Sequence, residues 1–324
     1  MNDMNGTEAR IFPKYTVISV ISIYILIMII AVPLNSLVLF GNLTKRRSRI
    51  KPSSILMANL ATTSLLMNTV TTSLEIYQVA RPKHVARNEM LCSIIGTSFS
   101  SLYFAVTQTL MFMSIDRYYA VKSVLQYALT VTRSRTKAAV AFIWLETFLL
   151  AALIMSPYSV NVEYTFNYGM CTVHFDHRTG INVCLVIIGG FIPFGIIVMS
   201  NWKMAILLRQ HTRRIKTRSN HQPTDNAKKN NAEVMERQVT TVVFWINITC
   251  FVCWMPAVII AVLQLVKINI PASLYIFAYI TSHLMTIVNA GLDLYVRTDM
   301  RNKVKQLFTR CRPNRSDEIE VSKT

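Results

Sequence analysis

An acid and a base stand side by side, as Asp116 and Arg117, in the stretch SIDRYYAVKSVLQY. They close a long run of the chain that is almost free of charged side chains. A guanidinium that bonds to a carboxylate can exchange that partner for another when its surroundings change. The simple interpretation is that a helix ends here and its charged residues enter water. The alternative is that Arg117 is the moving part of a switch.

No group of residues in the sequence has the pattern of a catalytic site. The sequence shows no metal ligands at the usual spacing, no glycine-rich phosphate loop, and no nucleophile with a base and an orienting acid. We therefore expect a protein that is not an enzyme and that holds neither a metal nor another cofactor.

The chain has 324 residues, of which 52% are hydrophobic and 15% charged, and its mean hydropathy is +0.37. Soluble domains have roughly 25% charged residues. Several runs reach the length of about 20 apolar residues that a helix needs to cross the hydrocarbon layer. Glu146 and His283 are rare ionisable side chains inside these runs. The runs are 17–40, 53–74, 93–115, 138–157, 181–208, 239–266 and 268–292. We predict an all-α membrane protein, a bundle of seven transmembrane helices.

The net charge of +18 is distributed unevenly along the chain. Few of the 34 lysines and arginines fall in one set of alternate loops, and most of them gather in the other set, as in KRRSRIK at 45–51. Basic residues stay on the cytoplasmic side of a membrane, where they also meet anionic lipid. The sequence thus predicts a plasma-membrane protein with its N-terminus outside and its C-terminus inside. Its basic residues are expected to meet membrane lipid and not nucleic acid.

This topology divides the chain into three parts. Residues 1–15 form an extracellular N-terminus, and residues 16–297 form the seven-helix domain with a third cytoplasmic loop at about 209–237. Residues 298–324 form a cytoplasmic tail, which begins with apolar residues at helical spacing. We expect that beginning to be a short amphipathic helix on the membrane surface.

Four residues are candidates for covalent modification. Cys92 and Cys171 both lie on the oxidising outer side in this topology, so we expect a disulfide between them. Asn5 begins an outward-facing Asn-Gly-Thr glycosylation sequon. Cys311 follows the amphipathic stretch near the inner leaflet, which suits palmitoylation, and an unmodified tail cysteine is the alternative.

Seven helices with this orientation could form a receptor, a light-driven pump or part of a transporter. An ion pathway needs ionisable groups at mid-membrane, and here these depths offer only Glu146, His283 and, near the inner edge, Asp293. The chain shows no repeat of interrupted helices, which is usual in secondary transporters. The beginning MNGTE is similar to visual opsins, but the seventh run lacks a lysine for a retinal Schiff base. His283 stands roughly where that lysine would be sought.

Short motifs follow one another in register along the seven runs. They are PLNSLVLFGN at 33–42, NLATTS at 59–64, Cys92 followed by DRY at 116–118, Trp144, Pro193, and CWMP at 253–256. Together they resemble the rhodopsin-like (class A) G-protein-coupled receptors over nearly the whole chain. The resemblance implies a receptor for an extracellular ligand, with heterotrimeric G proteins as its partner and arrestin as a second candidate.

The DRY motif, Asp116, Arg117 and Tyr118, lies at the inner end of the third helix in such receptors. Glu236 matches the family's acidic partner for the arginine, although MERQ at 235–238 is also typical of a solvated helix start. The resemblance implies a resting contact between Arg117 and Glu236, whose loss releases helix six outward.

Further residues belong to this expected machinery. Pro193 and Pro256 each remove a backbone hydrogen bond and mark where helices five and six can bend. Trp254 in CWMP belongs both to this set and to the ligand pocket. Leu125 is apolar in an otherwise polar loop, so we expect it to contact the G protein or, alternatively, to pack its own loop.

The sequence departs from the family at several switch positions. Ser64 replaces the sodium-binding aspartate of the second helix, and Asn201 replaces a tyrosine of the fifth. The NPxxY motif of helix seven is degenerate. The favoured alignment places Asn289 on its Asn and Asp293 on its Tyr, and it puts an acid where it could pair with a base. The other alignment uses Tyr295 as the tyrosine.

By resemblance, the ligand pocket lies between the outer halves of helices three, five, six and seven. Phe99 occupies the position of the amine counter-ion, so a biogenic amine is disfavoured. An aromatic, sparsely charged cavity suits a lipid, a small neutral molecule or the tip of a peptide. Glu75 and Lys267 are expected at its rim, and simple packing is the alternative role for the aromatic residues and for His283. The candidates are Phe99, Ser100, Tyr103, Trp254 and His283.

Two other functions stay open at this point. The degenerate inner motifs also suit a seven-helix transport or accessory protein that has lost G-protein coupling. An unusual opsin-like receptor is the other alternative.

Overall fold

The computed structural model describes residues 13–44, 51–123, 127, 129–156, 161–165, 170–174, 187–219, 227–265, 268, 270–298 and 300–302. The side chains at 208–219 and 227–237 are not described. Asn5, Leu125 and Cys311 lie outside the described residues. So does most of the expected surface helix, which therefore stays a prediction.

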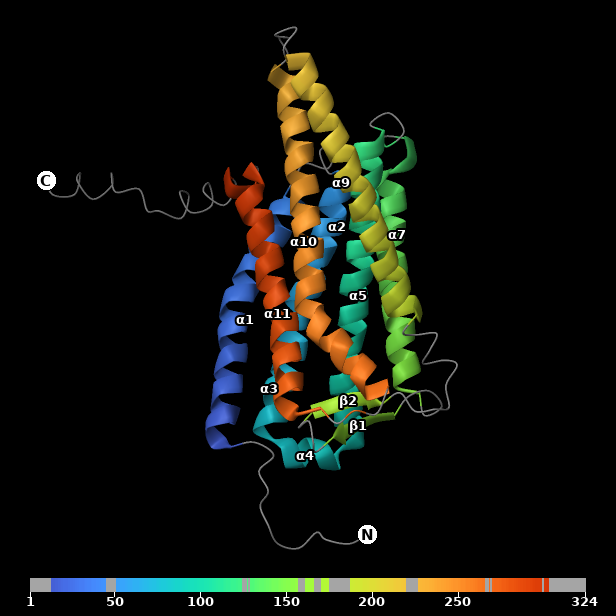
Figure 1. Cartoon of the computed structure of the whole chain (residues 1–324). Coiled ribbons are helices and arrows are strands. Elements are labelled where there is room, and N and C mark those ends of the chain that lie inside the picture. The colour runs from blue at the N-terminus through green and yellow to red at the C-terminus, as the bar shows by residue number, and fades with distance from the viewer. Residues whose placement is uncertain are drawn as a thin grey trace, which may run out of the picture.

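Long helices that run side by side form the body of the molecule (Figure 1). The longest are α1 (Lys14–Leu43), α5 (Glu89–Lys122), α7 (Arg133–Ile154), α10 (Ala227–Leu265) and α11 (Ala272–Val296). The helices α1, α5 and α7, together with Gln238–Ile260 of α10 and Ser273–Val296 of α11, are long and apolar enough to cross a membrane by length and composition. A short helix, α4 (Pro82–Arg87), connects two of the long segments.

The second and fifth expected spans are also helical, but each contains a π-helical turn. In the second, α2 (Pro52–Leu66), η2 (Met67–Thr71) and α3 (Thr72–Ala80) follow one another without a break. In the fifth, η3 (Ile187–Phe191) leads directly into α9 (Ile192–Ser219). Such turns are irregularities that often occur where helices carry function.

The two prolines expected to bend helices occupy different places. Pro193 is the second residue of α9 and lies close to η3. This helix is therefore irregular because of a π-helical turn as well as a proline. Pro256 lies inside α10. Figure 1 shows the axis of α10 changing direction in its lower part, as expected where proline removes a backbone hydrogen bond.

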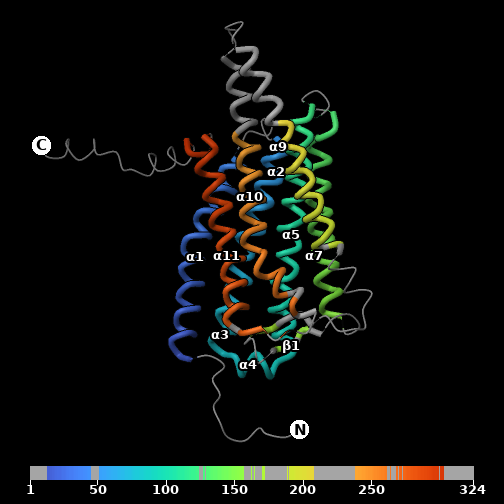
Figure 2. The backbone as a smooth tube through the Cα atoms, viewed as in Figure 1, coloured from blue at the N-terminus to red at the C-terminus, as the bar shows by residue number. Residues whose placement is uncertain are grey.

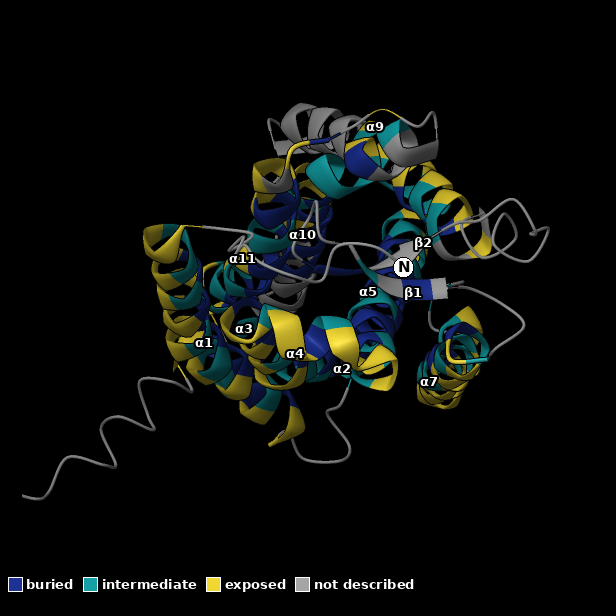
Figure 3. Cartoon of the chain, turned by 90° about the horizontal axis from the view of Figure 1, so that it is seen from below, coloured by how far each residue is buried: buried dark blue, intermediate teal, exposed yellow. Residues whose placement is uncertain are grey.

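Buried residues lie toward the middle of the bundle and exposed residues lie toward its outside (Figure 3). Among the exposed residues are large apolar ones, such as Phe148 at 67% and Trp202 at 71%. An outer surface of this kind suits lipid, and helices satisfy the backbone polar groups that lipid cannot. The composition and the structure therefore agree on a membrane environment.

The helices pack in a fixed pattern of neighbours (Figure 2). Helix α10 packs mainly on α11, α9 mainly on α5, and α1 on both α2 and α11. The largest buried cluster lies between α2, α5, α9, α10 and α11 and includes Leu110, Met113, Val243 and Met285. This apolar core surrounds the polar groups that are candidates for function.

One end of the bundle carries a hairpin that the expected all-α architecture omitted. Strand β1 (Asn161–Thr165) pairs antiparallel with β2 (Met170–His174). The hairpin lies so close to α5 that a Cβ added at Gly96 would be 2.7 Å from Val162 Cγ1. The residues of β1, NVEYT, alternate between polar and apolar, which is typical of a strand and could have indicated it. Contact with α5 and a covalent link to it hold the two strands in place.

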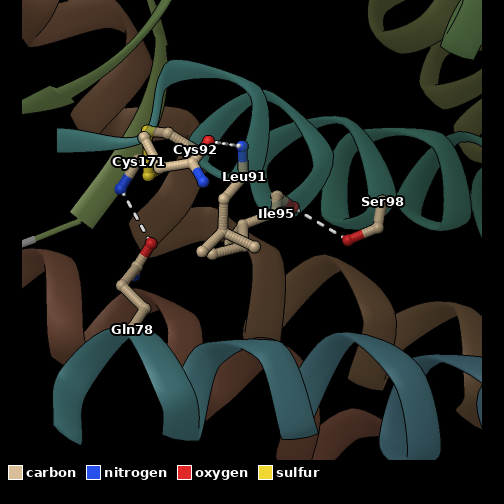
Figure 4. Close-up of a disulfide and its surroundings, with 7 residues drawn as sticks. Gln78, Leu91, Cys92, Ile95, Ser98 and Cys171 are labelled. Atoms are coloured by element: carbon tan, nitrogen blue, oxygen red, sulfur yellow. Dashed lines mark hydrogen bonds between the residues drawn. A yellow bond between two sulfur atoms is a disulfide. The ribbon is translucent and has the colours of Figure 1, made fainter. Parts of the chain in front are cut away.

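The expected disulfide between Cys92 and Cys171 is confirmed and joins α5 to β2 (Figure 4). The backbone N–H of Cys171 also donates to Gln78 Oε1 of α3 at 2.9 Å. Tyr164 of β1 packs against the buried cluster that contains Cys92 and Cys171, and burial raises the pKa of its hydroxyl to about 12. The hairpin is thus fastened to two helices, and this end of the bundle is called the disulfide end below.

The disulfide should contribute strongly to stability because it closes a separation of 79 residues. We expect Cys171→Ser to lower the melting temperature of the detergent-purified protein by roughly 5–10 °C, as for the loss of about 2–5 kcal/mol. Tryptophan fluorescence during heating measures it. Cys253→Ser, at a free and half-buried cysteine, is the matched control. Equal melting of the two variants would contradict a structural role for the disulfide.

Candidate functional site

Asp116 and Arg117 lie inside α5 and not at its end, because the helix continues to Lys122. Their side chains are 5% and 1% exposed. Arg117 Nε donates to Asp116 Oδ2 at 2.8 Å, and Arg117 Nη2 donates to the same oxygen. The simple interpretation, that charged residues mark the exit of a helix into water, is therefore wrong. The end of the bundle that holds this pair is called the Arg117 end below.

Tyr127, from the segment after α5, completes this group. Its hydroxyl donates to Asp116 Oδ1 at 2.8 Å and accepts from Arg117 Nη2 at 3.3 Å. A buried ion costs several kcal/mol unless its partner and its hydrogen bonds compensate for the lost water. Asp116 and Tyr127 therefore make the burial of Arg117 possible. The side chain of Glu236 lies outside the described residues, so the Arg117–Glu236 contact stays a prediction.

Tyr118, the third residue of the motif, contacts two lysines. Lys122 Nζ lies 5.7 Å from the centre of its ring, and Lys203 Nζ of α9 lies 5.9 Å away. These are cation–π distances, which are worth about 0.5–1 kcal/mol at exposed sites. Tyr118 thus contacts α9 from α5, through Lys203, at the Arg117 end.

A polar link joins three helices one turn before Arg117. Asn247 Nδ2 of α10 donates to Ser114 Oγ of α5 at 2.9 Å and to Asn201 Oδ1 of α9 at 3.2 Å. The sequence had drawn attention to Asn201 as a replacement for the family's tyrosine, but it had not predicted this link. These hydrogen bonds connect the helix expected to move, α10, to the helix that carries Arg117.

The last turn of α11 is anchored by a second buried pair. Arg297 Nη1 lies 3.1 Å from Asp293 Oδ1 and is also 3.3 Å from Asn42 Oδ1 of α1 and 2.8 Å from Met57 Sδ of α2. The acid that the favoured helix-seven alignment placed in the core thus has Arg297 as its base. Asn289 is 2% exposed, and neither of its amide atoms has a hydrogen-bond partner among the described residues.

A third buried pair lies toward the disulfide end. His283 Nε2 of α11 is 2.8 Å from Glu75 Oε2 of α3, with side chains 0% and 2% exposed. Thr72 Oγ1 lies 3.2 Å from His283 Nδ1, and the ring of Tyr24 from α1 meets the imidazole edge-on at 5.7 Å. Glu75 was expected at the rim of a pocket. It is buried because α3 continues beyond Leu74 to Ala80 and so carries Glu75 inside the bundle.

Three of the five pocket candidates come together as an aromatic group. The ring centre of Trp254 lies 3.8 Å from that of Tyr103 and 6.0 Å from that of Phe99. Phe99 also stacks on Tyr279, with ring centres 4.5 Å apart. The sequence had not drawn attention to Tyr279. Ser100 Oγ donates to the carbonyl of Gly96 in its own helix. The group lies beside His283, whose ring centre is 6.2 Å from that of Phe99.

The described residues offer a site neither for a metal ion nor for covalently bound retinal. No three His, Cys, Asp or Glu side chains gather in the described part of the chain so as to hold a metal ion. Helix α11 contains no lysine, and His283, which stands nearest to the expected attachment point, is paired with Glu75. The residues present therefore do not fit a covalently bound retinal.

The fold and the buried groups at its two ends define a class of protein. The model of the family "7 transmembrane receptor (rhodopsin family)" matches residues 34–293. The match covers most of the chain, which therefore belongs to this family. The protein is a seven-helix receptor of the plasma membrane and not an enzyme.

One characterised relative is "Rhodopsin, GQ-coupled" from Mizuhopecten yessoensis. It is 25% identical over 234 residues, which cover 69% of this chain and 45% of the relative. The chain thus spans about half the length of the curated relative it matches.

The pairing of Glu75 with His283 should matter for stability, since it joins α3 to α11 without access to water. We expect Glu75→Ala or His283→Ala to destabilise the protein by about 3–5 kcal/mol, because each leaves one buried partner alone. A double variant, Glu75→Leu with His283→Leu, should recover much of the loss. Thermal unfolding in detergent measures all three.

The control for this comparison of two single variants with the double variant is Glu146→Ala, at a half-buried acid of α7. If the double variant is as unstable as the sum of the two single variants, the side chains do not act as a pair.

Proposed function

We propose that this receptor transmits the binding of a ligand at the disulfide end to a heterotrimeric G protein at the Arg117 end. The observation that carries the proposal is the buried group of Asp116, Arg117 and Tyr127. An arginine that is 1% exposed needs hydrogen-bond partners wherever it goes. Its alternative partners are therefore restricted to groups that arrive when the helices move.

The distribution of basic residues supports an orientation for this signal. Most of the basic residues behind the net charge of +18 fall in the loops and tail at the Arg117 end. Basic residues stay on the cytoplasmic side of a membrane, so the Arg117 end would be cytoplasmic. The disulfide end then faces the oxidising outside, with the sequon of Asn5 on the same side. Cys311 would lie near the inner leaflet as a palmitoylation site.

Outward movement of helix six would open the Arg117 end. Pro256 lets α10 bend, and the Arg117–Glu236 contact would hold it at rest. Asn247 adds a second restraint through Ser114 and Asn201. A bias of about 1–3 kcal/mol is typical for coupling between two sites. Loss of one such restraint would then change the balance of states without unfolding the bundle.

The ligand is proposed to be uncharged where it meets the aromatic group. Phe99, Tyr103 and Trp254 offer ring faces. The position expected for the counter-ion of an amine holds Phe99, and the nearby acid, Glu75, is 1% exposed and lies against His283. A lipid, a small neutral molecule or a peptide tip fits this environment, whereas a biogenic amine does not.

Gq is the G protein to test first, because the relative from Mizuhopecten yessoensis carries GQ-coupled in its name. Arrestin is a second partner to test. Leu125 is proposed to contact the G protein from the loop after α5, close in sequence to Tyr127.

A nucleotide-exchange assay on membranes with purified Gq tests the coupling. We expect Glu236→Ala and Tyr127→Phe each to raise basal exchange about three- to tenfold, since each removes a hydrogen-bond partner worth about 1 kcal/mol from the resting state. The matched controls are Glu233→Ala on the same helix and Tyr15→Phe at an exposed tyrosine of α1. Both should leave exchange unchanged.

Exchange at the level of empty membranes with every G-protein class, for the wild type and both variants, would contradict the proposal. That result would favour a seven-helix protein that has lost coupling.

A further inference from the structure

The short helix α4 lies on the surface of the disulfide end (Figure 3). Pro82 is its first residue and suits that position, because a proline there loses no intrahelical hydrogen bond. Val85 is 0% exposed and belongs to the buried cluster that contains Cys92 and Cys171. The helix is therefore fixed against the bundle through its apolar residue, beside the disulfide.

The solvent side of α4 is basic. Lys83, His84 and Arg87 are exposed, and so is Arg81, directly before the helix. Lys83 and Arg87 are four residues apart and therefore lie on one face of the helix, away from Val85. The four exposed residues Arg81, Lys83, His84 and Arg87 are called the α4 basic patch below.

The α4 basic patch has no acidic partner within the described part of the chain. Its lysine and arginines form no ion pair there, and Glu89, exposed at the beginning of α5, pairs with none of them. The imidazole Nδ1 of His84 lies 3.2 Å from the hydroxyl of Tyr77, which is a neutral contact. Like charges at a spacing of four residues destabilise a helix. The arrangement is thus unfavourable unless an anion from outside the chain meets it.

The patch is also unusual for its side of the membrane. In the proposed orientation, seven lysines and arginines lie outside, and three of the seven belong to the patch. Basic residues gather on the cytoplasmic side, where the leaflet carries anionic lipid. The outer side therefore needs an anion of another kind to meet the patch. The other four outer residues are Arg10, Lys14, Arg178 and Lys267.

We propose that the α4 basic patch binds a sulfated polysaccharide outside the cell. Short segments with several lysines and arginines are typical of surfaces that bind heparin, and arginine suits oxyanions because it donates through two N–H groups. The basic side chains are spread over about 9 Å of helix, at about 1.5 Å per residue, so they suit a linear chain with repeated anions. An acidic peptide would also present apolar side chains, with which basic side chains make no matching contact. The proposal rests on the proposed orientation and not on coupling to a G protein.

Binding to intact cells tests the patch, because such cells present only the outer side of the receptor. Inner basic segments, such as KRRSRIK at 45–51, then stay out of reach. The full chain carries an N-terminal epitope tag and is expressed in cells that make no sulfated polysaccharide. A fluorescent heparin dodecasaccharide is titrated onto these cells, and its signal is divided by that of an antibody against the tag. We expect saturable binding that cells without the receptor do not show.

Two double variants, each of which removes two outer cations, locate the binding. Lys83→Gln with Arg87→Gln should lower the affinity for the dodecasaccharide about tenfold, as expected for the loss of two exposed charge contacts. Arg10→Gln with Lys14→Gln removes the same charge from the beginning of the chain and should leave the affinity unchanged. The tag antibody shows that both variants reach the cell surface. A chemically desulfated dodecasaccharide should not bind to the wild type.

Three results would overturn the proposal. The first is an equal loss of binding in the two double variants, which would indicate net charge and not the patch. The second is displacement of the probe by polyglutamate as effective as by unlabelled heparin, which would identify an acidic polypeptide as the partner. The third is the absence of binding to intact cells that the tag antibody stains. A tag that is stained only after permeabilisation would contradict the orientation as well, so the two failures are distinguishable.

Discussion

The structure depends on one constraint, which is that no charge can be left unpaired inside a bundle that excludes water. Two buried ion pairs obey it, Arg117 with Asp116 and Arg297 with Asp293, and the buried acid Glu75 lies 2.8 Å from His283. The contact of Glu75 with His283 restricts the rotation of α3 against α11, and Arg297 restricts α11 through Asn42 of α1 and Met57 of α2. The apolar core supplies most of the buried area, but it would tolerate other rotations more readily than these pairs do.

The pairs differ in a way that suits a receptor with one firm end and one adjustable end. At the disulfide end, the Cys92–Cys171 bond and the pairing of Glu75 with His283 both connect separate elements. At the Arg117 end, Asp116 and Arg117 are neighbours on one helix, so helices can move without separating them. The described ties between helices there include weaker, neutral bonds, such as Thr298 Oγ1 to Gln238 Oε1 at 3.2 Å.

The sequence was sufficient for the helical spans, the disulfide and the family, because these follow from length, hydropathy and the order of motifs. It was insufficient wherever the contacts of a residue depended on the direction in which its side chain points. Glu75 was placed at a rim because its apolar run stopped one residue earlier, yet the helix continues and carries it inward. Tyr127 and Asn247 had no such signal, since their partners come from other segments. The alternation in NVEYT could have indicated β1, but the position of the hairpin depends on its contacts with α5.

The central claim is that release of Arg117 from its other resting partners, Tyr127 and the proposed Glu236, lets α10 move away at that end. Its most direct test is the distance between nitroxide labels at Leu43 of α1 and Thr241 of α10, measured by double electron–electron resonance in nanodiscs. The account predicts one short distance for the wild type. It predicts a second population, longer by several ångströms, for Tyr127→Phe and for the wild type bound to nucleotide-free Gq. Identical distributions in all three samples would contradict it.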